Sequence, residues 1–314
     1  MACVSNVSDL EIEITNRIAV ALRSAVRDER GDSDSVVVAD GARRPVLNLV
    51  QLNDGRKMSF LHRICENEAA PTIVFVHGFP LDHSMWQGQL PLAQQATLLM
   101  PDLCGFGQSD PCDEGVTMRS FADDIAKLLN QLGISKVVFC GLSMGGYIGW
   151  EFVKHHGEKL NGLVCCNTRA AADDEMTARA RRVAAAQVLK TGAEPVAVAM
   201  QEKLFSPATR SGNPDLVARL SEVMAATDPH SIAAAQLAMS QRSDFLSEVS
   251  EIELPTLVIA GEHDPITVSS KMQELSMLIG ESTFVEIAES GHLSPAEQPG
   301  VFNSALTHWL SRVA

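Results

Sequence analysis

Gly141-Leu142-Ser143-Met144-Gly145 is the stretch of this sequence that decides the fold. It has the pattern G-x-S-x-G, in which a serine stands on a tight turn between a strand and a helix. An apolar, strand-like run from Val137 to Cys140 precedes it, and a helical run from Tyr147 to Val153 follows it. The tight turn crowds the backbone, so the flanking positions favour glycine. The stretch predicts a serine hydroxyl held at the N-terminus of a helix, where negative charge is stabilised; the alternative is a structural turn with an idle serine.

Further apolar runs of strand length lie on both sides of this stretch: Thr72–Val76, Ala96–Met100, Thr256–Ile259 and Thr283–Ile287. Runs that are apolar on both faces suit the strands of a parallel sheet covered by helices. Between two of them, apolar residues from Met118 to Leu132 keep one helical face, and Gly133 ends the helix. The alternation predicts an α/β fold with a doubly wound sheet, whose active sites gather at the carboxyl ends of the strands.

The pattern changes along the chain and predicts three regions. Residues 1–45 contain one short stretch of helical spacing followed by a polar linker, which indicates a flexible extension or, alternatively, a docking helix. Residues 46–167 and 249–314 carry the α/β alternation and form the expected core. Residues 168–248 are rich in Ala, Arg, Gln and Met and suggest helix after helix, so we expect a helical lid inserted into the sheet.

Composition limits the class of protein. The 314 residues are 46% hydrophobic with a formal net charge of −14, which argues against nucleic acid as a partner. We expect no membrane association, because no apolar stretch approaches the roughly 20 residues that span a bilayer, and no secretory signal is evident. The seven cysteines form no C-x-x-C pair, which favours reduced, buried thiols and a cytoplasmic location over a metal site.

A serine becomes a strong nucleophile only when a base takes its proton and a third group orients that base. His292 is the expected base, because it lies in a loop just beyond the last predicted strand. Asp264, after the preceding predicted strand, is the expected acid, with Glu262 and Asp102 as alternatives. The order Ser143, Asp264, His292 along the chain is the one found in folds that carry this strand–serine–helix motif.

Attack on a carbonyl also needs preorganised N–H donors for the oxyanion. We expect one from the backbone of Met144, directly after the serine, and one from the backbone of Phe79 in the loop after the strand that ends at Val76. Each such donor is worth on the order of 3 kcal/mol in the transition state.

Together these residues resemble the α/β-hydrolase superfamily, from about Val46 to the C-terminus. The stretches that carry the resemblance are His77–Trp86, Asp102–Asp110, Gly141–Gly146, Gly261–Asp264 and Ser290–Leu293. Within the superfamily the chain looks most like the group of 3-oxoadipate enol-lactonases, small carboxylesterases and cofactor-free haloperoxidases or perhydrolases. The resemblance implies a mostly parallel eight-stranded sheet with a lid between the sixth and seventh strands. No metal or organic cofactor is expected, because the nine histidines include no H-E-x-x-H pair and no phosphate loop or dinucleotide fingerprint appears.

Three positions refine the resemblance. Ser143 stands where haloalkane dehalogenases and epoxide hydrolases of this fold have an aspartate nucleophile. Pro80 matches a proline of the perhydrolase-like members, which implies some peracid formation from a short acid and hydrogen peroxide. Cys104 stands where the family pattern has arginine, and this departure has no interpretation.

The leading interpretation is hydrolysis of a small carboxylic ester or lactone through an acyl-enzyme. The alternatives are a perhydrolase or carbon–carbon bond hydrolase that uses the same triad, and a non-catalytic binding protein that reuses the fold. The substrate and the oligomeric state stay open.

Overall fold

The computed structural model describes residues 47–112 and 115–313, so the prediction for residues 1–45 lies outside the described residues. It contains eight strands: β1 (Leu47–Gln51), β2 (Lys57–Arg63), β3 (Thr72–Val76), β4 (Thr97–Pro101), β5 (Val137–Leu142), β6 (Leu160–Cys166), β7 (Thr256–Gly261) and β8 (Ser282–Ile287). Each of the five strand runs expected from the sequence corresponds to one of these strands, with ends that agree to within two residues.

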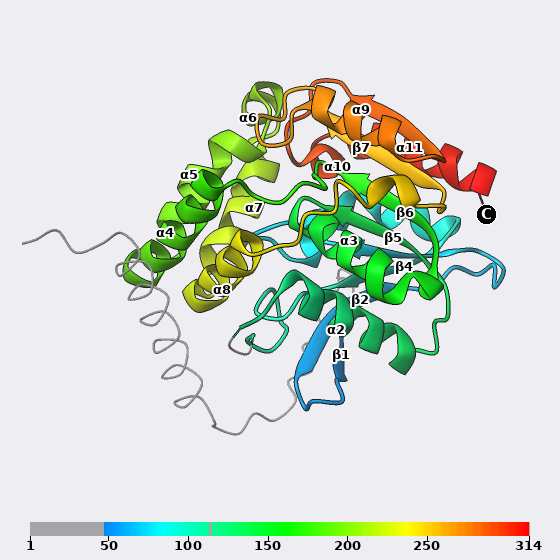
Figure 1. The fold of residues 1–314 in the computed structure, drawn as a ribbon, viewed down its shortest axis with the longest axis horizontal. Coiled ribbons are helices and arrows are strands. Elements are labelled where there is room, and N and C mark those ends of the chain that lie inside the picture. Colours follow the sequence, from blue (N-terminus) through cyan, green and yellow to red (C-terminus); the bar gives the residue numbers. More distant parts are fainter. Residues whose placement is uncertain (1–46, 113–114, 314) are drawn as a thin grey trace, which may run out of the picture.

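All eight strands form one sheet in the order β1-β2-β4-β3-β5-β6-β7-β8 (Figure 1). β1 pairs with β2, and β2 with β4, in antiparallel fashion, whereas the remaining neighbours are parallel. The carboxyl ends of β3 to β8 therefore meet at one edge of the sheet. The predicted α/β-hydrolase fold class is confirmed.

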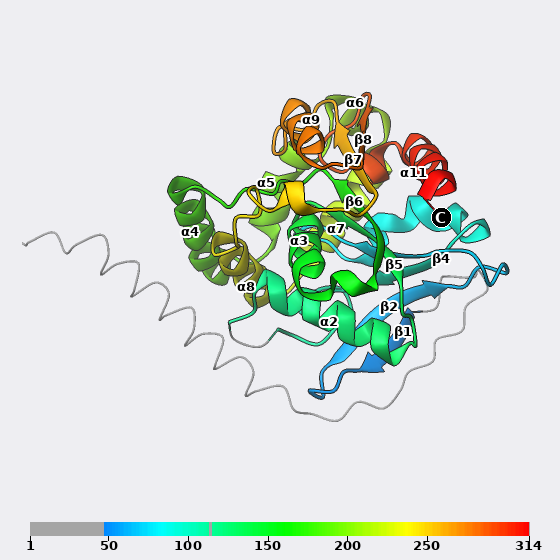
Figure 2. The same ribbon diagram turned by 45° about the vertical axis from the view of Figure 1, so that its right-hand side comes forward.

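Helices cover both faces of the sheet because alternate residues of each central strand point to opposite sides. In β3, Val74 and Val76 pack with α2 (Met118–Gln131), α3 (Met144–His156) and α9 (Ser269–Leu278). Ile73 and Phe75 pack on the other side with the 3₁₀ segment η1 (His83–Gln94) and α11 (Pro299–Val313). Figure 2 shows the sheet between these two layers of helices.

The sequence sets both ends of α2. Thr117 caps its N-terminus, where its side chain and that of Ser120 each accept a hydrogen bond from the other's backbone N–H. Gly133 ends the helical segment with φ +69°, a conformation that favours glycine. The helix expected from the apolar spacing is therefore present.

Five helices lie between β6 and β7: α4 (Glu175–Thr191), α5 (Glu194–Leu204), α6 (Pro207–Gly212), α7 (Pro214–Ala226) and α8 (Pro229–Ser240). They lie to one side of the sheet, away from the C-terminus of the chain (Figure 1). The two ends of this helical insertion, the expected lid, are joined, since Phe245 donates a backbone hydrogen bond of 3.0 Å to Ala170 and the buried Arg242 pairs with Asp173 at 2.7 Å. The remaining helical segments are η2 (Gly157–Lys159), η3 (Val249–Glu251) and α10 (Ser294–Glu297).

The six cysteines within the described residues are buried and form no disulfide. Cys140 and Cys166 lie on adjacent strands, with their sulfur atoms 3.8 Å apart. None of the described helices combines the length and apolar character needed to cross a membrane.

Candidate active site

Ser143 stands between β5 and α3 with φ +55° and ψ −111°. The turn needs glycine on both sides, because a Cβ on Gly145 would lie 2.2 Å from the Val76 carbonyl oxygen and one on Gly141 would lie 2.3 Å from the Gly145 carbonyl oxygen. The serine N–H donates to the carbonyl of Cys166, at the end of the neighbouring strand. Ser143 is partly exposed although its neighbours are buried, so its hydroxyl is held at the carboxyl edge of the sheet at a helix N-terminus.

The loops after β7 and β8 bring Asp264 and His292 together. Their side chains join through a 2.8 Å hydrogen bond between His292 Nδ1 and Asp264 Oδ2, and both residues are buried. The carboxylate also accepts hydrogen bonds from the backbone N–H of Ile266 and Thr267, from the Thr267 hydroxyl and from the Asn167 amide.

These partners keep Asp264 ionised. Burial alone would raise the pKa of the Asp264 carboxyl. The charge and hydrogen bond of His292, with the hydrogen bonds of Thr267 and Asn167, outweigh burial and hold that pKa well below its usual value. An ionised carboxylate on Nδ1 leaves Nε2 as the ring nitrogen that can accept a proton.

The two alternative acids have other partners. Asp102 accepts hydrogen bonds from His83 Nδ1 at 2.7 Å and from the His83 N–H at 2.9 Å. Burial alone would lower the pKa of His83, but the Asp102 hydrogen bond and charge outweigh it and raise that pKa. Glu262 accepts a hydrogen bond from the backbone N–H of Glu289. Of the three candidate acids, Asp264 is the one that contacts His292.

The third pair of the expected triad is Ser143 and His292, and these two side chains are not hydrogen bonded to each other. Within residues 47–112 and 115–313, no hydrogen bond joins Ser143 Oγ to His292 Nε2. Bonds between a nucleophile and its base are often long without substrate and shorten in the reactive complex. The structure therefore brings the base and acid together directly and places the serine at the same edge of the sheet.

Asn167 and Thr168, directly after β6, bond to the segments that carry Ser143, Asp264 and His292. The sequence pattern did not predict this role. The Asn167 amide donates to Asp264 Oδ2 at 2.8 Å and to the Gly291 carbonyl at 3.3 Å, and its oxygen accepts from Ser294. The Thr168 hydroxyl donates to the carbonyl of Ser143 at 2.8 Å. The only available signal was the position of a polar pair after the buried Cys165-Cys166 run.

An Asn167→Ala variant is expected to lose activity without losing its fold. Removing one hydrogen bond to the buried Asp264 carboxylate costs about 1.5–3 kcal/mol, which corresponds to roughly a tenfold to hundredfold lower kcat/KM if the bond orients the acid. Asn303→Ala is the control, because Asn303 lies on α11 and bonds to Gly88 and Gln89. Steady-state kinetics of both variants test this, and equal kinetics of Asn167→Ala and the control would contradict it.

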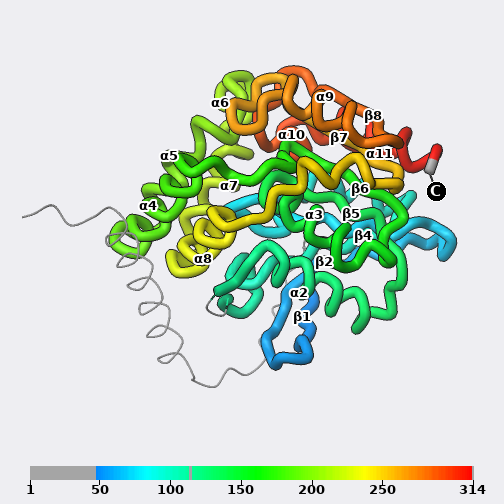
Figure 3. The backbone as a smooth tube through the Cα atoms, viewed as in Figure 1, coloured from blue at the N-terminus to red at the C-terminus, as the bar shows by residue number. Residues whose placement is uncertain are grey.

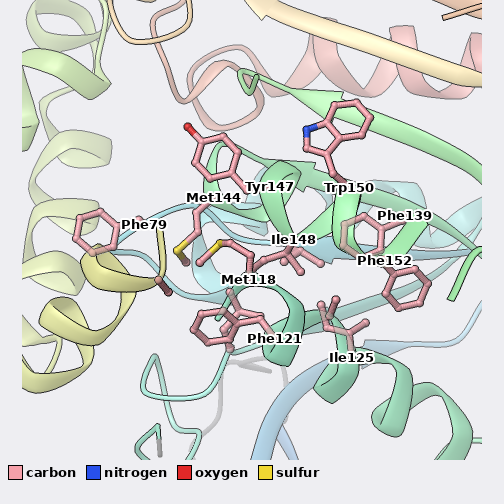
Figure 4. Packing of buried hydrophobic residues seen from close by; sticks show 14 of the residues in the cluster. Phe79, Met118, Phe121, Ile125, Phe139, Met144, Tyr147, Ile148, Trp150 and Phe152 are labelled. Carbon is pink, nitrogen blue, oxygen red and sulfur yellow. The ribbon is translucent and has the colours of Figure 1, made fainter. Parts of the chain in front are cut away.

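The loop after β3 carries one of the expected oxyanion donors, the N–H of Phe79, and the first turn of α3 carries the other, the N–H of Met144. Burial lowers the pKa of His77, whose neutral ring accepts the Leu103 N–H at Nε2 and bonds to the Gly78 carbonyl through Nδ1. In the described part of the chain, the backbone N–H groups of Phe79 and Met144 have no acceptor. The Met144 N–H belongs to the first turn of α3, where no intrahelical acceptor exists. Figure 4 shows the Phe79 ring beside helices of the insertion between β6 and β7, and the side chains of Met144 and Tyr147 on α3.

One group of three potential metal ligands lies together in the described residues: Asp82, His83 and Asp102. The protein's own donors already engage its oxygens, since Asp82 caps η1 through Ser84, and Asp102 accepts from His83 and from the Gln108 N–H. This arrangement orders the loops after β3 and β4.

Comparisons with known proteins agree with the fold. Residues 71–299 match the sequence model of the family described as alpha/beta hydrolase fold. A 3-oxoadipate enol-lactonase of Acinetobacter baylyi is 30% identical over 243 residues, which cover 77% of this chain and 89% of that protein.

Two solved structures are similar over most of their length. A thermophilic esterase from Thermogutta terrifontis shares 33% identity with a TM-score of 0.81, covering 85% of this chain and 99% of the esterase. The enol-lactonase from Burkholderia xenovorans shares 26% identity with a TM-score of 0.78, covering 84% of this chain and 100% of that chain. On the sheet order, the glycine-flanked serine turn and these matches, the chain belongs to the α/β-hydrolase family.

Proposed function

We propose that this protein hydrolyses a small carboxylic ester or lactone through an acyl-enzyme on Ser143. The observation that carries the proposal is the buried 2.8 Å hydrogen bond between Asp264 and His292, at the edge of the sheet where Ser143 stands on its tight turn. An oriented imidazole beside a serine at a helix N-terminus is the arrangement that acyl transfer needs.

Each of these residues has one role in the proposed reaction. His292 Nε2 takes the proton of Ser143 while the serine oxygen attacks the carbonyl carbon, and Asp264 stabilises the resulting imidazolium. The N–H groups of Phe79 and Met144 donate to the oxyanion of the tetrahedral intermediate. His292 then gives its proton to the leaving oxygen, and the acyl-enzyme forms. Water, activated by the same histidine, releases the acid and restores the serine.

One finding supports a small acyl group and another supports the ester and lactone classes. The end of α5 packs against the loop that carries the base, because the backbone N–H of His292 donates to the Leu204 carbonyl. The relatives in the comparisons are named as enol-lactonases and an esterase, and their names supply the ester and lactone classes.

Hydrolysis of p-nitrophenyl esters from acetate to octanoate, together with an unsubstituted γ-lactone, tests the proposal. We expect turnover of acetate and butyrate esters, a fall in kcat/KM towards octanoate, and ring opening of the lactone measured by acid release. Turnover of neither the esters nor the lactone would contradict the proposed function. A preference for octanoate would contradict the small acyl pocket while leaving the acyl-enzyme in place.

A further inference from the structure

Glu297 is the last residue of the short helix α10, and its side chain is a buried carboxylate, since the residue is 8% exposed. It lies next to the loop between β8 and α10 (residues 288–293), called the base loop here because it carries His292. Its Oε1 accepts hydrogen bonds from the N–H of Gly291 at 2.9 Å and from the N–H of Leu293 at 3.2 Å. These are the residues on either side of His292. One carboxylate oxygen therefore fixes the backbone on both sides of the expected base.

The other oxygen of Glu297 reaches the lid. Oε2 accepts the backbone N–H of Ser206 at 2.8 Å, in the turn between α5 and α6. The Ser206 hydroxyl donates to the carbonyl of Glu289 at 2.8 Å, at the start of the base loop. The N–H groups of His292 and Leu293 both donate to the Leu204 carbonyl, at 2.9 and 3.2 Å. Figure 3 shows the path of this lid turn between α5 and α6 and that of the chain entering α10.

The two segments leave no space between them. A Cβ on Gly291 would lie 2.6 Å from the Ser206 nitrogen and 2.9 Å from the Leu204 carbonyl oxygen. The backbone of the base loop is thus packed directly against the backbone of the lid turn. This close contact explains why position 291 is occupied by glycine.

A buried carboxylate persists only where donors compensate for its lost hydration. Glu297 has three backbone donors, two from the base loop and one from the lid, and hydrogen bonds to a charged acceptor are the strong ones. A side chain without acceptors would leave the N–H groups of Gly291 and Ser206, one on each segment, without their partner, and a glutamine would keep only one acceptor oxygen for the two segments.

We propose that Glu297 is a positioning residue that holds His292 in register by locking the base loop to the lid turn Leu204–Ser206. The inference rests on the proposed function, because it assigns Glu297 a role through the base. It also makes the lid turn part of the support of the catalytic machinery, so that a displaced lid turn displaces the imidazole from Ser143.

Kinetics of Glu297→Gln and Glu297→Ala on p-nitrophenyl acetate test this role. The glutamine keeps the size of the side chain and one acceptor oxygen, whereas the alanine removes all acceptors. We expect kcat to fall about tenfold for glutamine and about a hundredfold for alanine, with KM within about threefold of wild type because uniform substrate binding is untouched. Thermal unfolding of Glu297→Gln should stay close to that of wild type.

Glu151→Gln is the matched control. Glu151 is also a buried glutamate, 6% exposed, but it lies two turns beyond Ser143 on α3 and pairs with His155. We expect wild-type kcat for this variant.

Three results would overturn the proposal: a wild-type kcat for Glu297→Gln, an equal loss in Glu151→Gln, or a loss in Glu297→Gln that follows its unfolding temperature and raises KM in parallel. If the alanine variant does not fold, the glutamine variant decides. Failure of the proposed function is separate, since it would appear as no turnover by the wild type or as full activity of Ser143→Ala.

Discussion

The Ser143→Ala variant is expected to hydrolyse p-nitrophenyl acetate at least about 10⁴-fold more slowly than wild type in kcat/KM. The methyl group keeps the shape of the turn but removes the oxygen that attacks the carbonyl. Activity that survives would come from the oxyanion donors and from binding alone. Initial rates of ester hydrolysis, with circular dichroism and thermal unfolding to show that the variant folds, give the measurement.

Ser311→Ala is the control for this variant, because the Ser311 hydroxyl lies on α11 and donates to the carbonyl of His308. Its kcat/KM should equal that of wild type. A folded Ser143→Ala variant that keeps a tenth or more of the wild-type rate would contradict the assignment of the nucleophile.

The Asp264→Asn variant is expected to lose about 10³- to 10⁴-fold in kcat, because an amide at this position no longer stabilises the imidazolium and favours the wrong ring tautomer. The loss should appear in kcat more than in KM, since the carboxylate faces His292 and not the substrate. Steady-state kinetics with a short ester at pH 7 to 8 measure it.

The two other acids of the site region are the controls. Glu262→Gln should keep wild-type kcat, because Glu262 bonds to the Glu289 backbone. Asp102→Asn should lose less than Asp264→Asn, because Asp102 pairs with His83. A larger loss in either control than in Asp264→Asn would show that the acid is assigned wrongly.

The lowered pKa of Asp264 also predicts how acid weakens the fold. A carboxyl whose pKa is lower in the folded state than its value of 3.8 in the unfolded chain stabilises the fold above that pH, and this contribution is lost as pH falls towards the folded pKa. The difference in unfolding temperature between wild type and Asp264→Asn should therefore be constant above about pH 5 and shrink as pH falls below it. Thermal unfolding from pH 7 to pH 3 checks this, and a difference that grows on acidification would contradict it.

The sequence predicted the features that depend on local pattern. The glycine-flanked serine turn, the loops that carry Asp264 and His292, and the α2 helix all follow from short-range rules of turn geometry and periodicity. The start of α3 was less visible, because Gly145 and Gly146 interrupt the apolar pattern and the helix begins at Met144 rather than at Tyr147. These glycines are needed for close approach to Val76 and Thr168.

Other features depend on contacts between distant segments and could not be read from the sequence. β1 forms the outer edge of the sheet and its residues are exposed or half-buried, so it lacks the apolar run that marks a central strand. Asn167 bonds to a carboxylate 97 positions away, and Glu297 bonds to a lid residue 91 positions away. An isolated Asn or Glu in a sequence carries no sign of such a partner.

Mass spectrometry of the protein during turnover of a p-nitrophenyl ester tests the central claim most directly. After acid quenching, the account predicts an increase in intact mass equal to one acyl group, located by proteolysis on the peptide that contains Ser143 and absent from Ser143→Ala. An acyl group on any other residue would contradict the account. So would rapid ester hydrolysis by an enzyme on which no acyl group is found, although acid quenching is fast compared with turnover.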